Sequence, residues 1–366
     1  MQTAIERVLI YRLGSLGDTV VALPCFHQIA RAFPEAERCL LTNIPMHTKA
    51  PAAFAVLEGS GLVHGFMRYP VATRNFAELV ELQREIRAFR AQVLVYLTAR
   101  RSAADVLRDS AFFRLCGIPR IACVPLGRDT RVNRIDPQTG DCEPEAARLA
   151  RLVRSLGSVD LSDRANWDLG LTIAEHKRAA EVLEPVQGRP LVACCIGTKM
   201  QAKDWGSENW HRVLDSLAAK LPQYGLALVG AKEEAGLSEQ AATAWSGRLA
   251  NLCGMLTPRE SAAVLARARL FLGHDSGPMH LAAAGGTPCV VVFAARSRPR
   301  VWFPWGDHHE IIYHRTDCWD CDLDVCIEQK KKCLSSIAPA EVLSAVDRVL
   351  ARMNAVHKVV LRSGSV

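Results

Sequence analysis

The segment His274–Ala284, H-D-S-G-P-M-H-L-A-A-A, joins two apolar runs and predicts a strand–turn–helix unit. Leu270–Leu272 before it and Val290–Phe293 after it both have the composition of buried strands. A polar, glycine-containing turn between a strand and a helix presents unpaired backbone N–H groups, which stabilise an anion. Pro278 fits the first helical turn, because its missing N–H would have no partner there. The segment therefore predicts an anion site at the end of a strand.

Asp275 and Ser276 allow two interpretations. Either side chain can cap the helix by accepting a hydrogen bond from its first N–H groups. Capping accounts for only one of these polar residues, however. It gives no role to the other special residues between Asp275 and His280.

A second unusual turn lies near the N-terminus. The predicted strand Val8–Tyr11 leads into a turn that contains Gly14, Ser15 and Gly17 and ends at Asp18. The two glycines permit a tight turn and a close approach of the backbone to a ligand. Asp18 then stands at the start of a helix, where it acts either as a cap or as a general base at the mouth of the sheet.

A third loop follows the apolar strand Leu191–Ile196. It carries Thr198, Lys199 and Lys203 ahead of a predicted helix, Ser207–Leu214. A lysine in such a loop is a mobile positive charge suited to a diphosphate. The alternative is a solvated surface lysine, which is the usual state of a single lysine.

These three segments resemble glycosyltransferase family 9, the bacterial heptosyltransferases that extend the inner core of lipopolysaccharide. The family pattern D-[ST]-G-P-x-H-L-A-A-A-x-G-x-P matches Asp275–Pro288, with Gly285 where a bulkier residue is usual. The N-terminal turn ending in G-D and the K-x-W sequence at Lys203–Trp205 match the family as well.

The resemblance implies a role for each matching residue. Asp18 deprotonates the acceptor hydroxyl, and Gly14, Ser15 and Gly17 form a phosphate or acceptor loop. Glu234, preferred over Glu233, binds the donor ribose, although both carboxylates also suit the dipole of a helix N-terminus. The implied donor-binding residues are Thr198, Lys199, Lys203, Glu234, Asp275, Ser276, Gly277, Pro278, Met279 and His280.

Strands alternate with helices in both halves of the chain, which predicts an α/β protein with two doubly wound, Rossmann-like domains and parallel sheets. The resemblance implies the GT-B fold, in which the two domains face a cleft. We predict an acceptor-binding domain at 1–165 and a nucleotide-sugar-binding domain at 166–340, with a linker within Gly157–Leu171. The segment 341–366 contains the end of a helix, Ala338–Met353, that crosses back to the first domain in GT-B proteins.

Composition agrees with a globular enzyme, since 49% of the 366 residues are hydrophobic and 23% are charged. No apolar run reaches the roughly 20 residues that span a bilayer, and no signal peptide is evident, so we expect a cytoplasmic protein. The net charge of +7 suits a nucleotide diphosphate, a phosphorylated glycolipid or peripheral contact with the cytoplasmic face of the inner membrane. No nucleic-acid-binding motif is present.

Four of the thirteen cysteines are grouped as C-x₂-C-x₄-C-x₆-C, at Cys318, Cys321, Cys326 and Cys333. The spacing leaves two interpretations open, a structural zinc or iron site and a reduced surface loop. Four thiolates leave no open coordination position, so a metal here takes no part in catalysis.

The resulting prediction is an inverting glycosyltransferase that needs no metal for catalysis and uses an ADP-heptose-like donor with a lipopolysaccharide-core or other surface-glycan acceptor. Alternatives are a related transferase with another donor or a protein acceptor, a GT-B sugar-nucleotide epimerase, and a non-catalytic binding protein. A Rossmann dehydrogenase is disfavoured, because Gly14–Gly17 lacks the G-x-G-x-x-G spacing. The sugar, the acceptor and the oligomeric state are left open.

Overall fold

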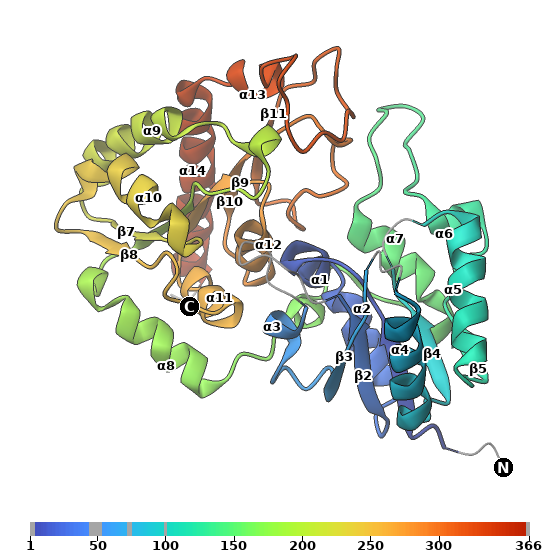
Figure 1. The fold of residues 1–366 in the computed structure, drawn as a ribbon. Coiled ribbons are helices and arrows are strands. Elements are labelled where there is room, and N and C mark those ends of the chain that lie inside the picture. The colour runs from blue at the N-terminus through green and yellow to red at the C-terminus, as the bar shows by residue number, and fades with distance from the viewer. Residues whose placement is uncertain (1–3, 44–52, 72–74, 99–100, 364–366) are drawn as a thin grey trace. The chain divides into compact units, whose positions relative to one another are not determined.

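The computed structural model describes residues 4–43, 53–71, 75–98 and 101–363, with side chains up to residue 355 (Figure 1). The chain divides into two compact units, Met1–Thr172 and Ile173–Val366. The division comes directly after the predicted linker at 157–171, and the predicted domain limits at 165 and 340 stay predictions.

The first unit is built on a parallel sheet of five strands in the order β3-β2-β1-β4-β5. Its strands are β1 (Arg7–Tyr11), β2 (Glu37–Thr42), β3 (Gly65–Arg68), β4 (Val93–Tyr96) and β5 (Arg120–Ala122). The middle strands are almost fully buried, because helices cover both of their faces. Continuous apolar runs are typical of such strands, which is why the sequence predicted them.

Alternate residues of these strands pack against two helices. Leu9, Tyr11 and Leu94 share one buried cluster with side chains of α4 (Phe76–Phe89) and α5 (Ala103–Leu115). The other helical elements of the unit are α1 (Leu16–Val21), α2 (Leu23–Ala32), α3 (Phe54–Leu57), α6 (Arg128–Arg131), α7 (Glu145–Leu152), η1 (Arg154–Leu156) and η2 (Arg164–Trp167).

The second unit contains a six-stranded parallel sheet in the order β11-β10-β9-β6-β7-β8. Its strands are β6 (Leu191–Cys195), β7 (Gly225–Leu228), β8 (Leu249–Asn251), β9 (Leu270–His274), β10 (Cys289–Phe293) and β11 (Glu310–Tyr313). Its helical elements are α8 (Ile173–Val182), η3 (Glu184–Val186), η4 (Gln201–Lys203), α9 (Ser207–Lys220), η5 (Lys232–Glu234), α10 (Ala235–Ala241), η6 (Thr243–Trp245), α11 (Pro258–Leu265), α12 (Gly277–Ala284), α13 (Lys332–Ser335) and α14 (Pro339–Ser363).

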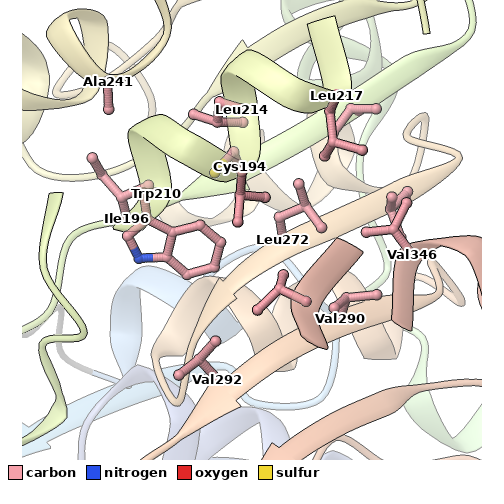
Figure 2. Packing of buried hydrophobic residues seen from close by; sticks show 14 of the residues in the cluster. Cys194, Ile196, Trp210, Leu214, Leu217, Ala241, Leu272, Val290, Val292 and Val346 are labelled. Atoms are coloured by element: carbon pink, nitrogen blue, oxygen red, sulfur yellow. The ribbon is translucent and has the colours of Figure 1, made fainter. Parts of the chain in front are cut away.

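One face of this sheet carries an extensive apolar core. Figure 2 shows Trp210, Leu214 and Leu217 of α9 with Val346 of α14, packed on strand residues such as Leu272. Burying one such side chain contributes about 1.5–3 kcal/mol relative to leaving it exposed. The core fixes the sheet and α9, and with them the positions of the loops at the strand ends.

Helix α14 belongs to this core, because Val342, Val346 and Val349 are buried in the same cluster. Its predicted return to the first unit stays a prediction. Among the described residues, no helix combines the length and the apolar character that crossing a membrane requires.

Besides the strands named above, the sequence predicts strands at 39–42, 93–96, 120–124, 225–229 and 249–251, which correspond to β2, β4, β5, β7 and β8, but it predicts neither β3 nor β11. Both of these are edge strands of four residues and are only partly buried. Each includes a polar or charged residue and is not a continuous apolar run, so the apolar pattern alone does not reveal it. The sequence also predicts one helix over 143–156, which is too long. Helix α7 begins only after Pro144, because the residue before a proline avoids helical backbone angles, and the short η1 replaces the end of the predicted helix.

Candidate functional site

The candidate donor site lies at the carboxyl edge of the second sheet. Successive strands are added outward from β6 through β7 to β8 on one side of the sheet, and from β9 through β10 to β11 on the other side. The direction of the chain across the sheet therefore reverses between the neighbouring strands β6 and β9. In open α/β sheets, ligands bind at this reversal, outside the carboxyl ends of the strands. The loop with Lys203 follows β6 and the segment beginning at Asp275 follows β9, so two of the predicted donor segments meet there.

Lys203 and Asp275 form the central contact of this edge. Lys203 Nζ lies 2.7 Å from Asp275 Oδ2, and the two side chains are 17% and 7% exposed. Lys203 Nζ also donates to the Asp275 carbonyl oxygen at 3.4 Å. Asp275 is thus an ion-pair partner, and Ser276 occupies the cap position of α12 without a side-chain capping bond. The capping interpretation of these two residues was therefore wrong.

Glu234 reaches the same edge from the end of β7. A Cβ at Gly197 would lie only 1.9 Å from Glu234 Cδ, and one at Gly230 only 2.5 Å from Glu234 Oε2. Glu234 Oε2 also accepts the N–H of Ala231 at 2.8 Å. Only glycine leaves room for the carboxylate at these two strand ends. Glu233, by contrast, is exposed.

Cys195 lies beneath this group at the end of β6. Burial raises the pKa of its thiol well above the usual range, and the nearby Glu234 carboxylate raises it further. The Ser276 hydroxyl has the opposite, smaller effect on the same pKa. The thiol therefore stays protonated and uncharged, next to both Glu234 and Ser276.

The remaining predicted donor residues differ in exposure. Lys199 is exposed, while Thr198 is partly buried and accepts the N–H of Met200 at 3.4 Å. Gly277 and Pro278 are partly exposed at the start of α12. The side chains of Met279 and His280 are 0% and 6% exposed, so Met279 offers a ligand its backbone rather than its side chain.

The candidate base, Asp18, occupies the first turn of α1 in the first unit. Its Oδ2 accepts the Ser15 N–H at 2.8 Å and the Ser15 hydroxyl at 2.9 Å. A Cβ at Gly14 would lie 2.4 Å from Asp18 Cβ, and Gly14 has a φ of 151°. Gly14 is therefore required for the turn that positions Asp18.

Arg12, which the sequence prediction did not include, directly follows β1 and leads into this turn. It is 0% exposed, and its Nη2 donates to the Asp18 carbonyl oxygen at 2.7 Å. Burial lowers its pKa, whereas the nearby Asp18 and Glu145 raise it. A polar residue at the end of an apolar strand is the sequence signal for such a position, and His274 at the end of β9 carries the same signal.

The cysteine loop, residues 316–334, packs against the loop that carries Lys203. Cys326 N–H donates to Gln201 Oε1 at 2.8 Å, and Ala202 N–H donates to the Asp324 carbonyl at 3.0 Å. Lys331 Nζ donates to the Asp204 carbonyl at 2.6 Å. These contacts lie on both sides of Lys203 in the sequence.

The four thiols of this loop lie near one another. Burial raises the pKa of Cys333, and Cys318, Cys326 and Cys321 raise it further. Within the part of the chain that the structure describes, no three His, Cys, Asp or Glu side chains form a metal-binding group. The thiols are thus near one another but are not arranged as metal ligands, and the metal site stays a prediction.

Comparison with known proteins decides the family. A sequence model of "Glycosyltransferase family 9 (heptosyltransferase)" matches residues 140–332, more than half of the chain. The chain belongs to glycosyltransferase family 9. The match contains all ten predicted donor residues, and the predicted family is confirmed.

Individual relatives agree with this assignment. Lipopolysaccharide heptosyltransferase 3 of Escherichia coli is 30% identical over 149 residues, which are 40% of this chain and 43% of that protein. This family 9 chain therefore matches less than half the length of that relative.

Solved structures establish the fold. The family 9 glycosyltransferase of Veillonella parvula gives a TM-score of 0.72 at 18% identity, covering 96% of this chain and 99% of that one. The iron-containing heptosyltransferase TibC, solved with ADP-D-beta-D-heptose, gives 0.51 at 16% identity, covering 96% and 77%. These similarities confirm the predicted GT-B fold class.

Proposed function

We propose that this chain transfers a heptose, or a related sugar, from an ADP-heptose-like donor to a hydroxyl of a lipopolysaccharide core or another surface glycan, with inversion. The observation that carries the proposal is the Lys203–Asp275 pair at the strand reversal of the second sheet. Family membership supports glycosyl transfer, and TibC binds ADP-D-beta-D-heptose on a similar fold.

In this proposal the donor diphosphate is held by cations and N–H groups. Lys203 supplies a partly buried charge, and Thr198 lies on the same loop, whereas Lys199 on that loop is exposed and contributes little. The first N–H groups of α12, at Gly277–Met279, add the positive end of a helix. Glu234, against Gly197, accepts hydrogen bonds from ribose hydroxyls. These groups stabilise the negative charge that develops on the leaving diphosphate.

Asp18 acts as the base. Its bonds to Ser15 are both made by Oδ2, so we assign proton transfer to Oδ1. The carboxylate takes the proton of the acceptor hydroxyl, whose oxygen forms a bond to the anomeric carbon. The bond from that carbon to the diphosphate breaks on the opposite side, and ADP leaves. A single displacement of this kind inverts the anomeric configuration.

The donor is tested by binding. The purified chain is melted in the presence of ADP, ADP-heptose and sugar nucleotides with other bases, because a ligand that binds the folded state raises the melting temperature. We expect the largest increase with the adenine nucleotides. A larger increase with a uridine or guanosine sugar nucleotide contradicts the ADP-linked donor.

A pair of lysine variants locates the diphosphate. Lys203→Ala removes a charge-assisted contact and should weaken ADP binding about 10- to 100-fold. Lys199→Ala removes an exposed charge from the same loop and should change ADP binding less than about threefold. Equal effects of the two substitutions contradict the proposed site.

Product analysis tests the reaction itself. With a heptose-acceptor glycan, the proposal expects ADP and an extended glycan in equal amounts. An altered sugar nucleotide formed without any acceptor indicates an epimerase instead. Sugar on a protein, with none on the glycan, indicates a protein acceptor.

We also propose that the cysteine loop holds one structural zinc or iron ion. The support is the neighbourhood of its four thiols and the iron content of TibC, which has a similar fold. When bound, the ion would link the loop to α13 and take no part in transfer. Elemental analysis of protein purified without a histidine tag should give about one metal ion per chain, and a folded, metal-free protein contradicts the site.

We place the reaction in the cytoplasm, in peripheral contact with the inner membrane. The net charge of +7 supports contact with an acidic surface. Binding to vesicles that contain anionic lipid, and its loss at high salt, tests this contact.

A further inference from the structure

His274 is a buried histidine that the proposed chemistry does not use. It ends β9, is 0% exposed and directly precedes Asp275. Its Nε2 accepts two hydrogen bonds, from the backbone N–H of Trp205 at 3.1 Å and from the indole N–H of Trp210 at 3.0 Å. The first of these bonds joins the end of β9 to the Lys203 loop.

The two bonds define the state of the ring. Both partners are donors, so Nε2 carries a lone pair and the proton lies on Nδ1. Burial lowers the pKa of His274 to about 4. Asp204, Asp275 and the backbone of Gly197 oppose this effect, and Lys331 adds to it. The ring is thus a neutral acceptor at ordinary pH.

The bond to Trp205 holds the chain two residues after Lys203. The Trp205 side chain is fixed as well, because its indole N–H donates to the Ile337 carbonyl at 3.2 Å. The rings of Trp205 and Trp210 meet edge to face at 5.0 Å, and those of Trp210 and His274 at 5.2 Å. Buried aromatic rings therefore pack around the bond from Trp205 to His274.

Two consecutive residues of β9 and its following turn thus hold the Lys203 loop at two points. His274 holds the backbone at Trp205, while Asp275 holds the Lys203 amine at 2.7 Å. Because the imidazole is buried and packed, it restricts the loop more than a solvated contact would. The position of a flexible lysine depends on the backbone that carries it.

We infer that His274 is a positioning residue for the donor-binding lysine: its neutral imidazole fixes the backbone at Trp205 so that Lys203 points at the donor diphosphate. The role of Lys203 in this inference rests on the proposed function. The hydrogen bond from Trp205 to His274 is a feature of the structure itself.

Two variants separate the hydrogen bond from the packing. His274→Phe keeps an aromatic ring but removes the acceptor, which leaves the Trp205 backbone N–H and the Trp210 indole N–H without their partner. His274→Gln keeps an acceptor oxygen near the position of Nε2. We expect His274→Phe to weaken ADP binding about tenfold. The ADP affinity of His274→Gln should stay within about threefold of that of the original chain. A matched control is Trp245→Phe, which removes a buried indole bond to the Leu214 carbonyl but none of the hydrogen bonds described above for the Lys203 loop. It should lower the melting temperature without changing ADP affinity.

Hydrogen exchange tests the position of the loop without any ligand. The Trp205 amide should exchange at least about tenfold faster in His274→Phe than in the original chain, and at a near-normal rate in His274→Gln. An unchanged rate in His274→Phe overturns the inference. A chain that binds no ADP contradicts the proposed donor but leaves this measurement valid, so the two failures are distinguishable.

A double-mutant cycle tests the route through Lys203. If His274 acts by placing that lysine, His274→Phe should have little effect on ADP affinity when Lys203 is already alanine. Full additivity of the two substitutions overturns the positioning role and leaves His274 a purely structural residue.

Discussion

At the residue scale, the charged side chains of the candidate site are held in place by neighbouring residues. Ser15 holds Asp18, Asp275 holds Lys203, and the backbone of Gly197 lies against Glu234. Each partner restricts a flexible side chain before any ligand arrives. Preorganised groups of this kind contribute most to catalysis, because they need no rearrangement during the reaction.

Asp18→Asn should lower turnover about 100-fold or more, which is the effect of losing a general base, and leave ADP affinity unchanged. The fold should survive, since an amide oxygen can still accept the Ser15 N–H. Steady-state kinetics with donor and acceptor measure the effect. Glu260→Gln is the matched control, because Glu260 accepts the Thr257 N–H at 2.8 Å at the start of α11. Equal turnover in Asp18→Asn and the control excludes Asp18 as the base.

Buried histidines predict the pH dependence of stability. Burial lowers the pKa of both His274 and His309 from 6.5 to about 4. Between these values the unfolded chain binds more protons than the folded chain, so the free energy of unfolding falls as pH falls from about 6.5 to about 4. The loss at pH 5 relative to pH 7 is about 2 kcal/mol for each histidine.

Urea unfolding at pH 7 and pH 5 measures this loss. His274→Gln should remove about half of the histidine contribution, because glutamine does not titrate. The same pH dependence in His274→Gln and in the original chain would show that His274 is not buried in its neutral form.

At the element scale, hydrogen bonds join the cysteine loop to the Lys203 loop, so the proposed donor site depends on the folding of the cysteine loop. Gln201 and Asp204, on either side of Lys203, accept bonds from Cys326 and Lys331. The cysteine loop has no strand and little helix of its own, so its order depends on such contacts and on any bound metal.

Cys326→Ser should therefore lower both the metal content and the melting temperature, and weaken ADP binding as the Lys203 loop loosens. Elemental analysis, thermal unfolding and ADP titration measure the three effects on one sample. Cys39→Ala, which removes a buried thiol of the first unit, should lower stability with no change in metal content. Unchanged ADP affinity in a destabilised Cys326→Ser protein would separate the loop from donor binding.

At the scale of the whole molecule, the two units repeat one strand order. The first sheet runs 3-2-1-4-5 from its edge, and the second repeats this order with one further strand. In each, the segment after the first strand carries a predicted functional residue, Asp18 in the first turn of α1 or Lys203 in the loop after β6. The proposed base and the proposed donor site therefore occupy corresponding places in the two sheets.

Transfer should continue in EDTA during a short assay, because the proposed diphosphate ligands are a lysine and backbone N–H groups. Initial rates with and without EDTA measure this. A requirement for added Mg²⁺ or Mn²⁺ contradicts the proposal that a lysine and backbone N–H groups bind the donor diphosphate. A falling melting temperature at an unchanged initial rate points to the cysteine loop instead.

Much of this protein was predictable from local sequence. Buried central strands such as β6 and β9 are continuous apolar runs, and the segment Asp275–Pro288 carries the family pattern. Such signals are local, because a strand or a helix start depends on neighbouring residues. Edge strands β3 and β11 lack them and were missed.

Only the tertiary structure decided how the candidate residues pair. Lys203 and Asp275 are 72 residues apart, and they meet because β6 and β9 are neighbours in the sheet. The sequence offered Asp275 either a capping or a donor-binding role, without its partner Lys203, and it gave no role to His274 or Arg12. The order of strands depends on the packing of the whole unit, so contacts between loops at the strand ends cannot be derived from local patterns.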